Sequence, residues 1–382
     1  MYYKHPSFGI YINFPFCPSK CNFCAFGSRL FDQSAVDRYM LAVEDELKFF
    51  SQIFPFRDRE VKTVYVGGGT PTLICEELPL LLKNIKNGFR LDNSAEITVE
   101  AHPAGIRSER LLPLLREGFN RFSLGIQSFF DSDLVYMNRD HTVQEAHEAF
   151  RHARQAGFAN MNIDLIYGLP NQTLSQWEKN IYSAVKLFPE HLSIYGLSLE
   201  EKTYLDYLRK IGKVEETDDE LQAEMYLSAI QILEKEGYVH YEVSNFAKPG
   251  FESKHNLLYW SQGNFLGVGA HAASLMDGIH SLNETSIEGY IRKVKEAGRG
   301  VIQTEWLNKE ELLKEALIFG LRKTSGVKLS ELNPEYLPFL GIYLPKLMAL
   351  ARNGFLNQVH QEHFSPTGKG LLFSDYISMT LI

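Results

Sequence analysis

The sequence has no apolar run that approaches the roughly 20 residues needed to cross a bilayer. Its first residues, MYYKHPSFGI, lack both the apolar centre of a signal peptide and the Arg- and Ser-rich character of a transit peptide. Basic residues are not in excess, because the formal net charge is -8, and this argues against a general nucleic-acid binder. These absences predict a cytoplasmic protein with no nucleic-acid partner.

Cysteine is scarce, with 4 among 382 residues, which is too few for a disulfide framework. Three of the four, Cys17, Cys21 and Cys24, nevertheless lie close together in YINFPFCPSKCNFCAF, residues 11–26. In a reducing compartment, such a group of thiols is typical of metal or redox chemistry. The fourth, Cys75, lies far along the chain at the start of a predicted helix.

Tandem repeats and low-complexity tracts are also absent, and the first two thirds of the chain alternate strand-like with helix-like segments. The predicted strands cover residues 8–14, 61–67, 95–101, 121–127, 161–168 and 191–197, and the predicted helices include 34–50, 75–89, 142–158 and 174–188. This βαβ alternation is typical of a parallel sheet. Six such units, with right-handed crossovers, predict an α/β fold with an open, partial (β/α)6 barrel of the TIM type.

The alternation changes after the sixth unit. A seventh candidate strand, residues 238–246, follows a long helix-like stretch at 218–236, and residues 263–278 are Gly-rich and irregular. From about Lys309 the segments read as helices, and the last residues could hold a short strand and a final helix. We therefore expect the barrel over residues 1–250 and a smaller, mainly helical C-terminal domain over residues 251–382.

The carboxyl ends of the predicted strands carry polar groups or glycines. In a parallel β/α barrel the ligand site forms at these ends, because the loops that follow the strands converge there. The first strand leads into the cysteine loop and the second into GGGTPT, where consecutive glycines let a ligand approach the backbone closely. The remaining four strands end at or carry Glu100, Gln127, Asp164 and Ser198.

The spacing C-x3-C-x2-C would let one loop present three sulfurs to a single iron–sulfur cube. Clusters held by protein alone use four cysteines. With three, one iron keeps an open position for a substrate or cofactor, as catalytic metal sites do. Structural zinc, with Cys75 or a histidine as the fourth ligand, and incidental buried thiols are the alternatives.

This pattern after the first strand of a partial barrel, with the aromatic Phe23 just before the last cysteine, resembles the radical S-adenosylmethionine (SAM) enzymes. In that family the open iron of a [4Fe-4S] cluster chelates the amino and carboxylate groups of SAM, and the reduced cluster splits SAM into methionine and a 5'-deoxyadenosyl radical. The resemblance implies that Cys17, Cys21 and Cys24 hold the cluster. It also implies that Gly68, Gly69 and Thr70 meet the SAM amino group.

The motifs ITVEAHP, RFSLGIQSF, NRDHT, NIDLIYGLPNQT and HLSIYGLSLE follow in the order found in the oxygen-independent coproporphyrinogen III oxidases and their relatives. The resemblance implies that cofactor contacts come from Tyr11, Phe23, Glu100, Gln127, Arg139, Asp164 and Ser198. Carboxylates suit the ribose hydroxyls or the ammonium of SAM, whereas the planar fork of Arg139 suits its carboxylate.

Two functions compete within this subfamily. The oxidases decarboxylate two propionate chains of coproporphyrinogen III, whereas the similar HemW-type haem chaperones bind haem and pass it to acceptor proteins. The oxidases carry an additional cysteine two positions after the third, where this sequence has Phe26. Only sixteen residues precede Cys17, so we also expect no counterpart of the longer N-terminal segment that the oxidases fold over their substrate. Both features favour the chaperone.

The motif KHNLLYW, residues 254–260, fits the H-N-x-x-Y-W motif of the HemW group, and the tail of the chain resembles that group as well. A neutral imidazole is a common haem ligand, and Tyr and Trp offer flat apolar surface, so the resemblance implies that His255 ligates or lies against haem. The sequence thus predicts a haem chaperone that carries a [4Fe-4S] cluster and SAM. The predicted partners are haem, an electron donor and haem acceptors such as membrane-bound respiratory enzymes. The sequence is also compatible with a homodimer. The oxidase, or a radical enzyme with another substrate, is the alternative.

Overall fold

The computed structural model describes residues 7–360 and 362–382, and within them one large sheet contains twelve strands. Its centre consists of the six predicted strands, which pair in parallel and in chain order. They are β1 (Ser7–Phe14), β4 (Glu60–Gly68), β5 (Arg90–Ala101), β6 (Arg121–Gln127), β7 (Asn160–Tyr167) and β8 (His191–Gly196). The predicted partial barrel is confirmed, and all six carboxyl ends lie at one edge of the sheet.

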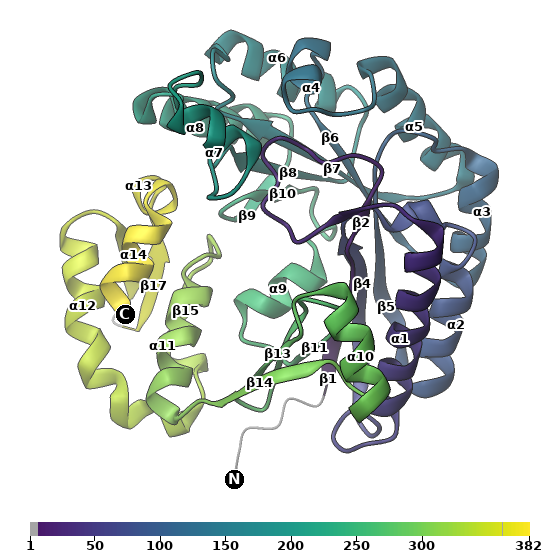
Figure 1. Cartoon of the computed structure of the whole chain (residues 1–382). Helices are drawn as coiled ribbons and strands as arrows, with labels where there is room; N and C mark the ends of the chain where they lie inside the picture. The colour runs from purple at the N-terminus through teal and green to yellow at the C-terminus, as the bar shows by residue number, and fades with distance from the viewer. Residues whose placement is uncertain (1–6, 361) are drawn as a thin grey trace.

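The connecting helices cover the outer face of this sheet (Figure 1). They are α1 (Gln33–Ser51), α2 (Leu78–Gly88), α3 (Ser108–Glu117), α5 (Val143–Ala156) and α6 (Leu174–Val185), with the short α4 (Asp131–Tyr136) after β6. Both α5 and α6 begin with a capping box, formed by Thr142 with Glu145 and by Thr173 with Gln176. These caps fix where the loops after β6 and β7 end and the helices begin.

The sheet continues on the far side of β1, where the sequence predicted irregular structure over residues 263–278. There β11 (Phe265–Val268) pairs in parallel with β1, and β12 (Ala273–Met276), β13 (Ile279–Asn283) and β14 (Val301–Trp306) follow in antiparallel order. The predicted domain boundary at residue 250 falls inside this sheet. Buried Glu46 on α1 stabilises the extension, because its carboxylate accepts from the backbone of Gly269 and from Tyr290 on α10 (Ile287–Ala297).

The other edge of the sheet corrects the seventh predicted strand. Residues 238–246 do not form one strand but a hairpin of β9 (Val239–Glu242) and β10 (Asn245–Ala247), and β10 pairs antiparallel with β8. The hydroxyl of Tyr226 on α8 (Asp219–Lys235) donates to the backbone oxygen of Val243 at the turn. The helix α7 (Tyr204–Lys210) follows β8 and donates from the amide of Leu205 to the backbone oxygen of Asn22, whereas α9 (Lys254–Trp260) packs against β4 and α11 (Lys309–Gly320).

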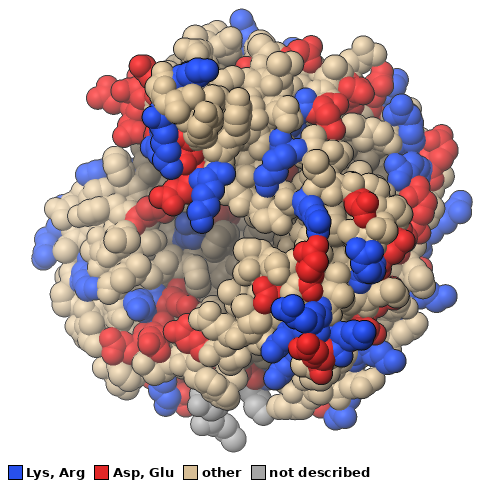
Figure 2. Space-filling view, in the orientation of Figure 1, with Lys and Arg blue, Asp and Glu red and all other residues tan. Residues whose placement is uncertain are grey.

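The C-terminal part has its own buried core, which runs from Leu312 to Leu381. Its helices are α11 (Lys309–Gly320), α12 (Leu340–Arg352), α13 (Gly368–Leu372) and α14 (Ser374–Leu381), and a small sheet joins β15 (Val327–Lys328), β17 (His363–Pro366) and β16 (Leu356–His360). The predicted helices are confirmed, whereas β15 and β16 were not predicted. Figure 1 places this part beside the open side of the barrel, and Figure 2 shows a hollow between the two.

None of the described helices has the length and hydropathy that crossing a membrane requires.

Candidate cofactor site at the strand ends

The cysteine loop is held in shape by backbone pairing. Within it β2 (Phe16–Cys17) pairs in parallel with β3 (Arg29–Leu30), and the amide of Phe31 donates to the backbone oxygen of Cys17 over 2.9 Å. Cys17, Cys21 and Cys24 are all partly exposed free thiols. Cys75 is buried instead, and its thiol donates to the backbone oxygen of Arg110. The three loop cysteines therefore form one group that Cys75 does not join.

The thiols of this group lie in surroundings that disfavour a free thiolate. Burial raises the pKa of Cys17 and that of Cys24, and the charge of a neighbouring cysteine raises each of them further. Hydrogen bonds from Ser28 and Thr70 act in the opposite direction on Cys17. A bound cation would supply the charge that these sulfurs need to deprotonate. This donor set fits an iron–sulfur cluster.

The glycine segment at the end of β4 packs directly on the backbone of the cysteine loop. The amides of Gly69 and Thr70 donate to the backbone oxygens of Phe14 and Phe16, both over 2.8 Å. A Cβ atom at Gly69 would lie 2.3 Å from the oxygen of Phe16, so only glycine allows this approach. Gly68 has a φ of 106° and donates from its amide to Glu100 over 2.9 Å. The glycines thus fix the loop that carries the cysteines.

Two carboxylates, Glu100 on β5 and Asp164 on β7, lie on the two strands that flank β6. Glu100 accepts from the hydroxyl of Tyr65 over 2.7 Å, and burial raises the pKa of Glu100 to about 7. Burial also raises the pKa of Asp164, which accepts from Asn162 over 2.7 Å. The charge of Asp164 raises the pKa of Glu100 and that of Glu100 raises the pKa of Tyr11, so these three predicted residues lie near one another. Together they offer acceptors for hydroxyl or ammonium groups.

Arg139 and Gln127 each hold a buried polar atom that no described residue hydrogen-bonds. The guanidinium of Arg139 donates from Nη1 to Cys21 Sγ over 3.3 Å and from Nη2 to the oxygen of Gly125 over 2.7 Å. Its Nε is buried and unpartnered, and so is Oε1 of Gln127, whose φ of 72° is unusual for a residue with a side chain. Buried polar groups are normally satisfied, so an unused donor and an unused acceptor next to the cysteine loop fit a ligand that carries a carboxylate and an ammonium.

Two of the predicted cofactor contacts, Ser198 and Phe23, make other contacts within the protein. Ser198 lies beyond the end of β8, is exposed and donates to Glu200 over 2.8 Å. Phe23 packs against a small apolar cluster that includes Leu134 and Met137, and this contact supports the cysteine loop. On the sixth strand Ser193 is buried, donates to Asn162 over 3.2 Å and lies opposite Asp164 in the strand pairing. The alternation of inward residues along HLSIYG was the signal that could have identified it.

The predicted haem residue His255 lies at the start of α9 and is only 1% exposed. Its Nδ1 is 2.7 Å from Thr63 Oγ1 and its Nε2 is 2.7 Å from the hydroxyl of Tyr259. Burial lowers the pKa of His255 to about 3, so the ring is neutral. Both ring nitrogens are hydrogen-bonded within the protein, and axial coordination would require one of these bonds to break.

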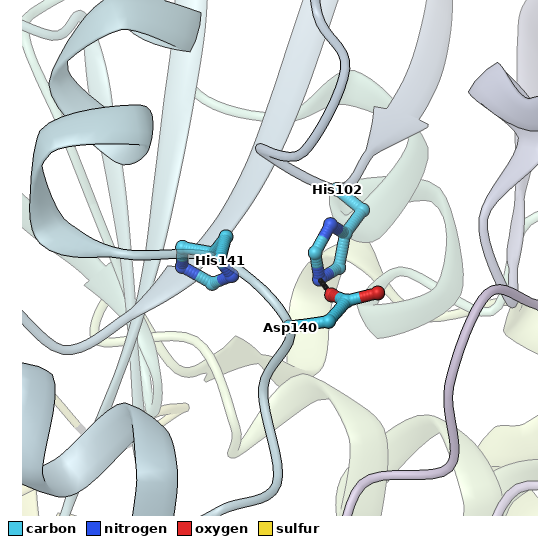
Figure 3. Close-up of side chains that lie close together, drawn as sticks. All are labelled: His102, Asp140 and His141. Carbon is cyan, nitrogen blue, oxygen red and sulfur yellow. Dashed lines mark ion pairs between the residues drawn. The ribbon is translucent and has the colours of Figure 1, made fainter.

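Three further polar residues gather beside Arg139 and were not assigned a role from the sequence: His102, Asp140 and His141 (Figure 3). One ligand atom from each lies within 4.8 Å of the others, and these residue types can hold a metal ion. However, the amide of Ala104 donates to Nδ1 of His102 over 3.1 Å, so the ring proton is on Nε2, which faces Asp140. A metal bound at Nε2 would force the ring proton onto Nδ1, where it would face the amide hydrogen of Ala104. The contacts therefore favour a histidine–carboxylate pair.

Comparison with known proteins yields two family matches and several long relatives. The model of the radical SAM superfamily matches residues 11–181, and that of the HemN C-terminal domain matches residues 307–373. The chain is 36% identical to the heme chaperone HemW of Bacillus subtilis over 91% of this chain and 92% of that protein. It is 35% identical to the heme chaperone HemW of Lactococcus lactis, over 83% and 82% of the two chains, and 31% identical to that of Mycobacterium tuberculosis, over 98% and 95%.

Among solved structures, the chain is similar to that of coproporphyrinogen III oxidase (HemN) from Escherichia coli, described as a radical SAM enzyme. The TM-score is 0.84 at 25% identity, and the alignment covers 99% of this chain and 91% of that one. The similarity therefore extends over the barrel, the extended sheet and the C-terminal part.

Proposed function

Because the chain belongs to the HemW heme chaperone family of the radical SAM superfamily, we propose that it binds haem and transfers it to acceptor proteins. The observation that carries this proposal is the length of the similarity: HemW relatives align over 91% and 98% of this chain, including its C-terminal part. Membership of the superfamily implies a [4Fe-4S] cluster and SAM. We propose the cytoplasm as the location.

For the cluster, the ligands would be Cys17, Cys21 and Cys24, which the glycine segment and β3 hold in one loop. When bound and reduced, the cluster supplies an electron to SAM. For SAM itself, the unpartnered Nε of Arg139 would donate to the carboxylate. The ammonium would meet the segment Gly68, Gly69 and Thr70, with the unpartnered Oε1 of Gln127 as a further acceptor. Glu100 and Asp164 would accept from hydroxyl groups.

For haem, the proposed site is the hollow between the barrel and the C-terminal part (Figure 2). The helix α9 carries His255, Tyr259 and Trp260, and the guanidinium of Arg322 lies 4.8 Å from the centre of the Trp260 ring. A porphyrin would meet aromatic surface and a cation there, and coordination by His255 would require release of Tyr259. The further partners that we propose are an electron donor and acceptors such as membrane-bound respiratory enzymes, and the functional unit could be a homodimer.

The similarity to the HemN structure favours a second candidate function, oxygen-independent coproporphyrinogen III oxidase. Against it stands Phe26, which occupies the position of the oxidases' additional cysteine and is 68% exposed. A thiol at that position would be open to solvent and reactants, whereas a phenyl ring has no redox or acid–base chemistry. The chaperone is therefore the better supported function.

The proposal is tested by two anaerobic assays on protein with a reconstituted cluster. In the first, haem is titrated in and the Soret absorbance is followed, and we expect saturable binding of one haem per chain. In the second, the protein receives SAM, a reductant and coproporphyrinogen III, and we expect no protoporphyrinogen IX. Efficient formation of protoporphyrinogen IX would establish the oxidase instead. If neither haem binding nor protoporphyrinogen IX is observed, the chaperone proposal is wrong and the third possibility, a radical enzyme with another substrate, survives.

A further inference from the structure

We propose that His102 and Asp140 form a brace that positions Arg139 for the carboxylate of SAM, an inference that rests on the SAM-binding role proposed above. His102 lies in the motif ITVEAHP and Asp140 in the motif NRDHT. The resemblance gave neither residue a role in the proposed function. They act on the site through Arg139 and are positioning residues, since neither is proposed to touch SAM.

The brace joins two segments that carry proposed SAM contacts. His102 follows the end of β5, two residues after Glu100, and Asp140 directly follows Arg139. The Nε2 atom of His102 lies 2.8 Å from Oδ1 of Asp140. The His102 side chain is only 4% exposed, whereas that of Asp140 is 36% exposed, so water reaches the contact from the Asp140 side alone. The loop that presents Arg139 is thus attached to the strand end that presents Glu100.

A third segment joins the brace through His141. Its Nε2 lies 3.2 Å from the backbone oxygen of Ile126, the residue before Gln127. Its ring stands edge-on to that of His102, with centroids 4.9 Å apart and an interplanar angle of 85°. Figure 3 shows the His141 ring with one nitrogen toward the His102–Asp140 pair. The group His102, Asp140 and His141 therefore links the three backbone segments that carry the proposed contacts Glu100, Gln127 and Arg139.

The charges of the brace suit this role. The close contact with His102 lowers the pKa of Asp140 to about 2, and burial lowers the pKa of His102, so the pair consists of a carboxylate and a neutral imidazole 2.8 Å apart. The positive charge of Arg139 also lowers the pKa of Asp140, which places the two side chains near each other. Asp140 is the next residue after Arg139, so holding Asp140 in place restrains the backbone that presents the guanidinium, whose Nε stays free for a ligand. Such preorganisation strengthens binding because fewer rotamers are lost when the ligand arrives.

The backbone near Arg139 supports the same conclusion. The amide of Arg139 donates to the oxygen of Leu134 over 2.8 Å, and Asn138 beside it has a φ of 56°. The side chain of Asn138 also donates to the backbone oxygen of Lys20 in the cysteine loop over 2.7 Å. The segment 138–141 thus lies between the cysteine loop on one side and His102 on the other. Loss of the His102 contact would remove the attachment of Asp140 to the end of β5, while the contacts of Arg139 and His141 to β6 and to the cysteine loop would remain.

Two substitutions at His102 distinguish the effect of its contact with Asp140 from that of its hydrogen bond with the amide of Ala104. In His102→Asn the amide oxygen still accepts from Ala104, as Asn does in an Asx turn, but the side chain is too short to reach Asp140. In His102→Gln the longer amide can donate to Asp140. We expect the SAM dissociation constant of the reconstituted protein to rise about tenfold in His102→Asn and to stay near the wild-type value in His102→Gln. Iron content and thermal midpoint should be the same in both variants.

A matched control comes from a similar pair elsewhere. Nε2 of His280 on β13 lies 2.9 Å from Oε1 of Glu315 on α11. His280→Asn removes a comparable histidine–carboxylate contact and should leave SAM affinity unchanged. The affinities are measured by the change in the electron paramagnetic resonance signal of the reduced cluster on SAM addition. Amide hydrogen exchange of residues 138–142 in SAM-free protein should be faster in His102→Asn alone.

The outcomes are distinguishable. Wild-type SAM binding that His102→Asn leaves unchanged would overturn this inference alone, and so would a His102→Gln variant as weak as His102→Asn. A wild-type protein that binds no SAM would overturn both the proposed function and this inference. One equivalent of zinc retained by a triple Cys17, Cys21 and Cys24→Ala variant, and lost when His102→Asn is added, would establish a metal site instead of a brace.

Discussion

The guanidinium of Arg139 donates to the sulfur of Cys21 over 3.3 Å, so the residue proposed to bind SAM also contacts a proposed cluster ligand. Its second terminal nitrogen is bound to Gly125, and its Nε is buried and unpartnered among the described residues. One side chain therefore connects the cysteine loop with the end of β6 and keeps a free donor at the position that we propose for the SAM carboxylate. Its planar fork is what allows three directed hydrogen bonds at once.

Arg139→Lys should separate SAM binding from cluster binding. A lysine ammonium cannot reproduce the bonds to Cys21 and Gly125 together with a third donor for a ligand. We expect SAM affinity to fall about 10- to 100-fold, with iron content unchanged, as measured by SAM titration of the reduced cluster. Arg154→Lys, which alters an arginine paired with Glu190 on the outer surface, is the control. Wild-type SAM affinity in Arg139→Lys would refute the assignment.

Gly69→Ala should impair the cysteine loop through the backbone. The added Cβ would lie 2.3 Å from the backbone oxygen of Phe16, so the loop must shift. We expect the free energy of unfolding to fall by about 1–3 kcal/mol and iron incorporation to fall with it. Gly341→Ala in α12 is the control, because a Cβ there meets nothing within 4 Å, and it should be neutral or stabilising by up to ~1 kcal/mol. Normal iron incorporation in Gly69→Ala would show that this contact does not shape the loop.

Two buried carboxyls predict a pH dependence of stability. Burial raises the pKa of Glu100 and of Glu242 from the ordinary 4.5 to about 7. Between these values the folded chain holds protons that the unfolded chain has released, so stability falls as pH rises from about 4.5 to about 7. In SAM-free protein the thermal midpoint should fall over this range, and Glu100→Gln should remove part of the fall, on the order of 1 kcal/mol. A fall that Glu100→Gln leaves unaltered would exclude Glu100 as a source.

Tyr259→Phe tests whether His255 ligates haem. The hydroxyl of Tyr259 lies 2.7 Å from Nε2 of His255, and the variant removes this competitor while it keeps the aromatic ring. If His255 coordinates haem, Tyr259→Phe should tighten haem binding about 3- to 10-fold, because no hydrogen bond has to break. His255→Ala should weaken it. Equal haem affinity in wild type and both variants would place the ligand elsewhere.

His360→Ala serves as the control for these haem titrations. His360 ends β16 in the C-terminal part and is exposed, so its loss should leave the absorbance titration unchanged. A parallel loss of affinity in His360→Ala would indicate nonspecific binding to surface histidines.

The six barrel strands could be predicted because their apolar runs alternate with amphipathic helices, a local pattern that the chain itself carries. The placement of Glu100, Gln127 and Asp164 followed from the rule that parallel strands end at one edge. The strand β11 could not be predicted, because it pairs with β1, far away in the sequence, with Gly267 opposite Tyr11. A Cβ at Gly267 would also lie 2.0 Å from the backbone oxygen of Ala273 on β12. Glycine there permits a pairing that Gly-rich composition alone does not indicate.

The candidate site, like the fold, could be predicted only in part. Ser198 was expected at the rim because the sixth strand was drawn to residue 197, whereas β8 ends at Gly196 and Ser193 lies opposite Asp164 instead. The burial of His255 on α9 depends in part on its contact with Thr63 on β4, which is far away in the sequence. Pairings of this kind are set by the packing of the whole fold and leave no local pattern.

Haem transfer tests the central claim most directly. The chain, loaded with one equivalent of haem and freed of excess by gel filtration, is mixed with a haem-free acceptor apoprotein, and the absorbance of both species is followed with time. We expect haem to leave the chain and to appear in the acceptor faster than it exchanges to a protein scavenger of free haem. Haem that stays on the chain, or that reaches acceptor and scavenger at the same rate, would contradict the proposal that this protein is a haem chaperone.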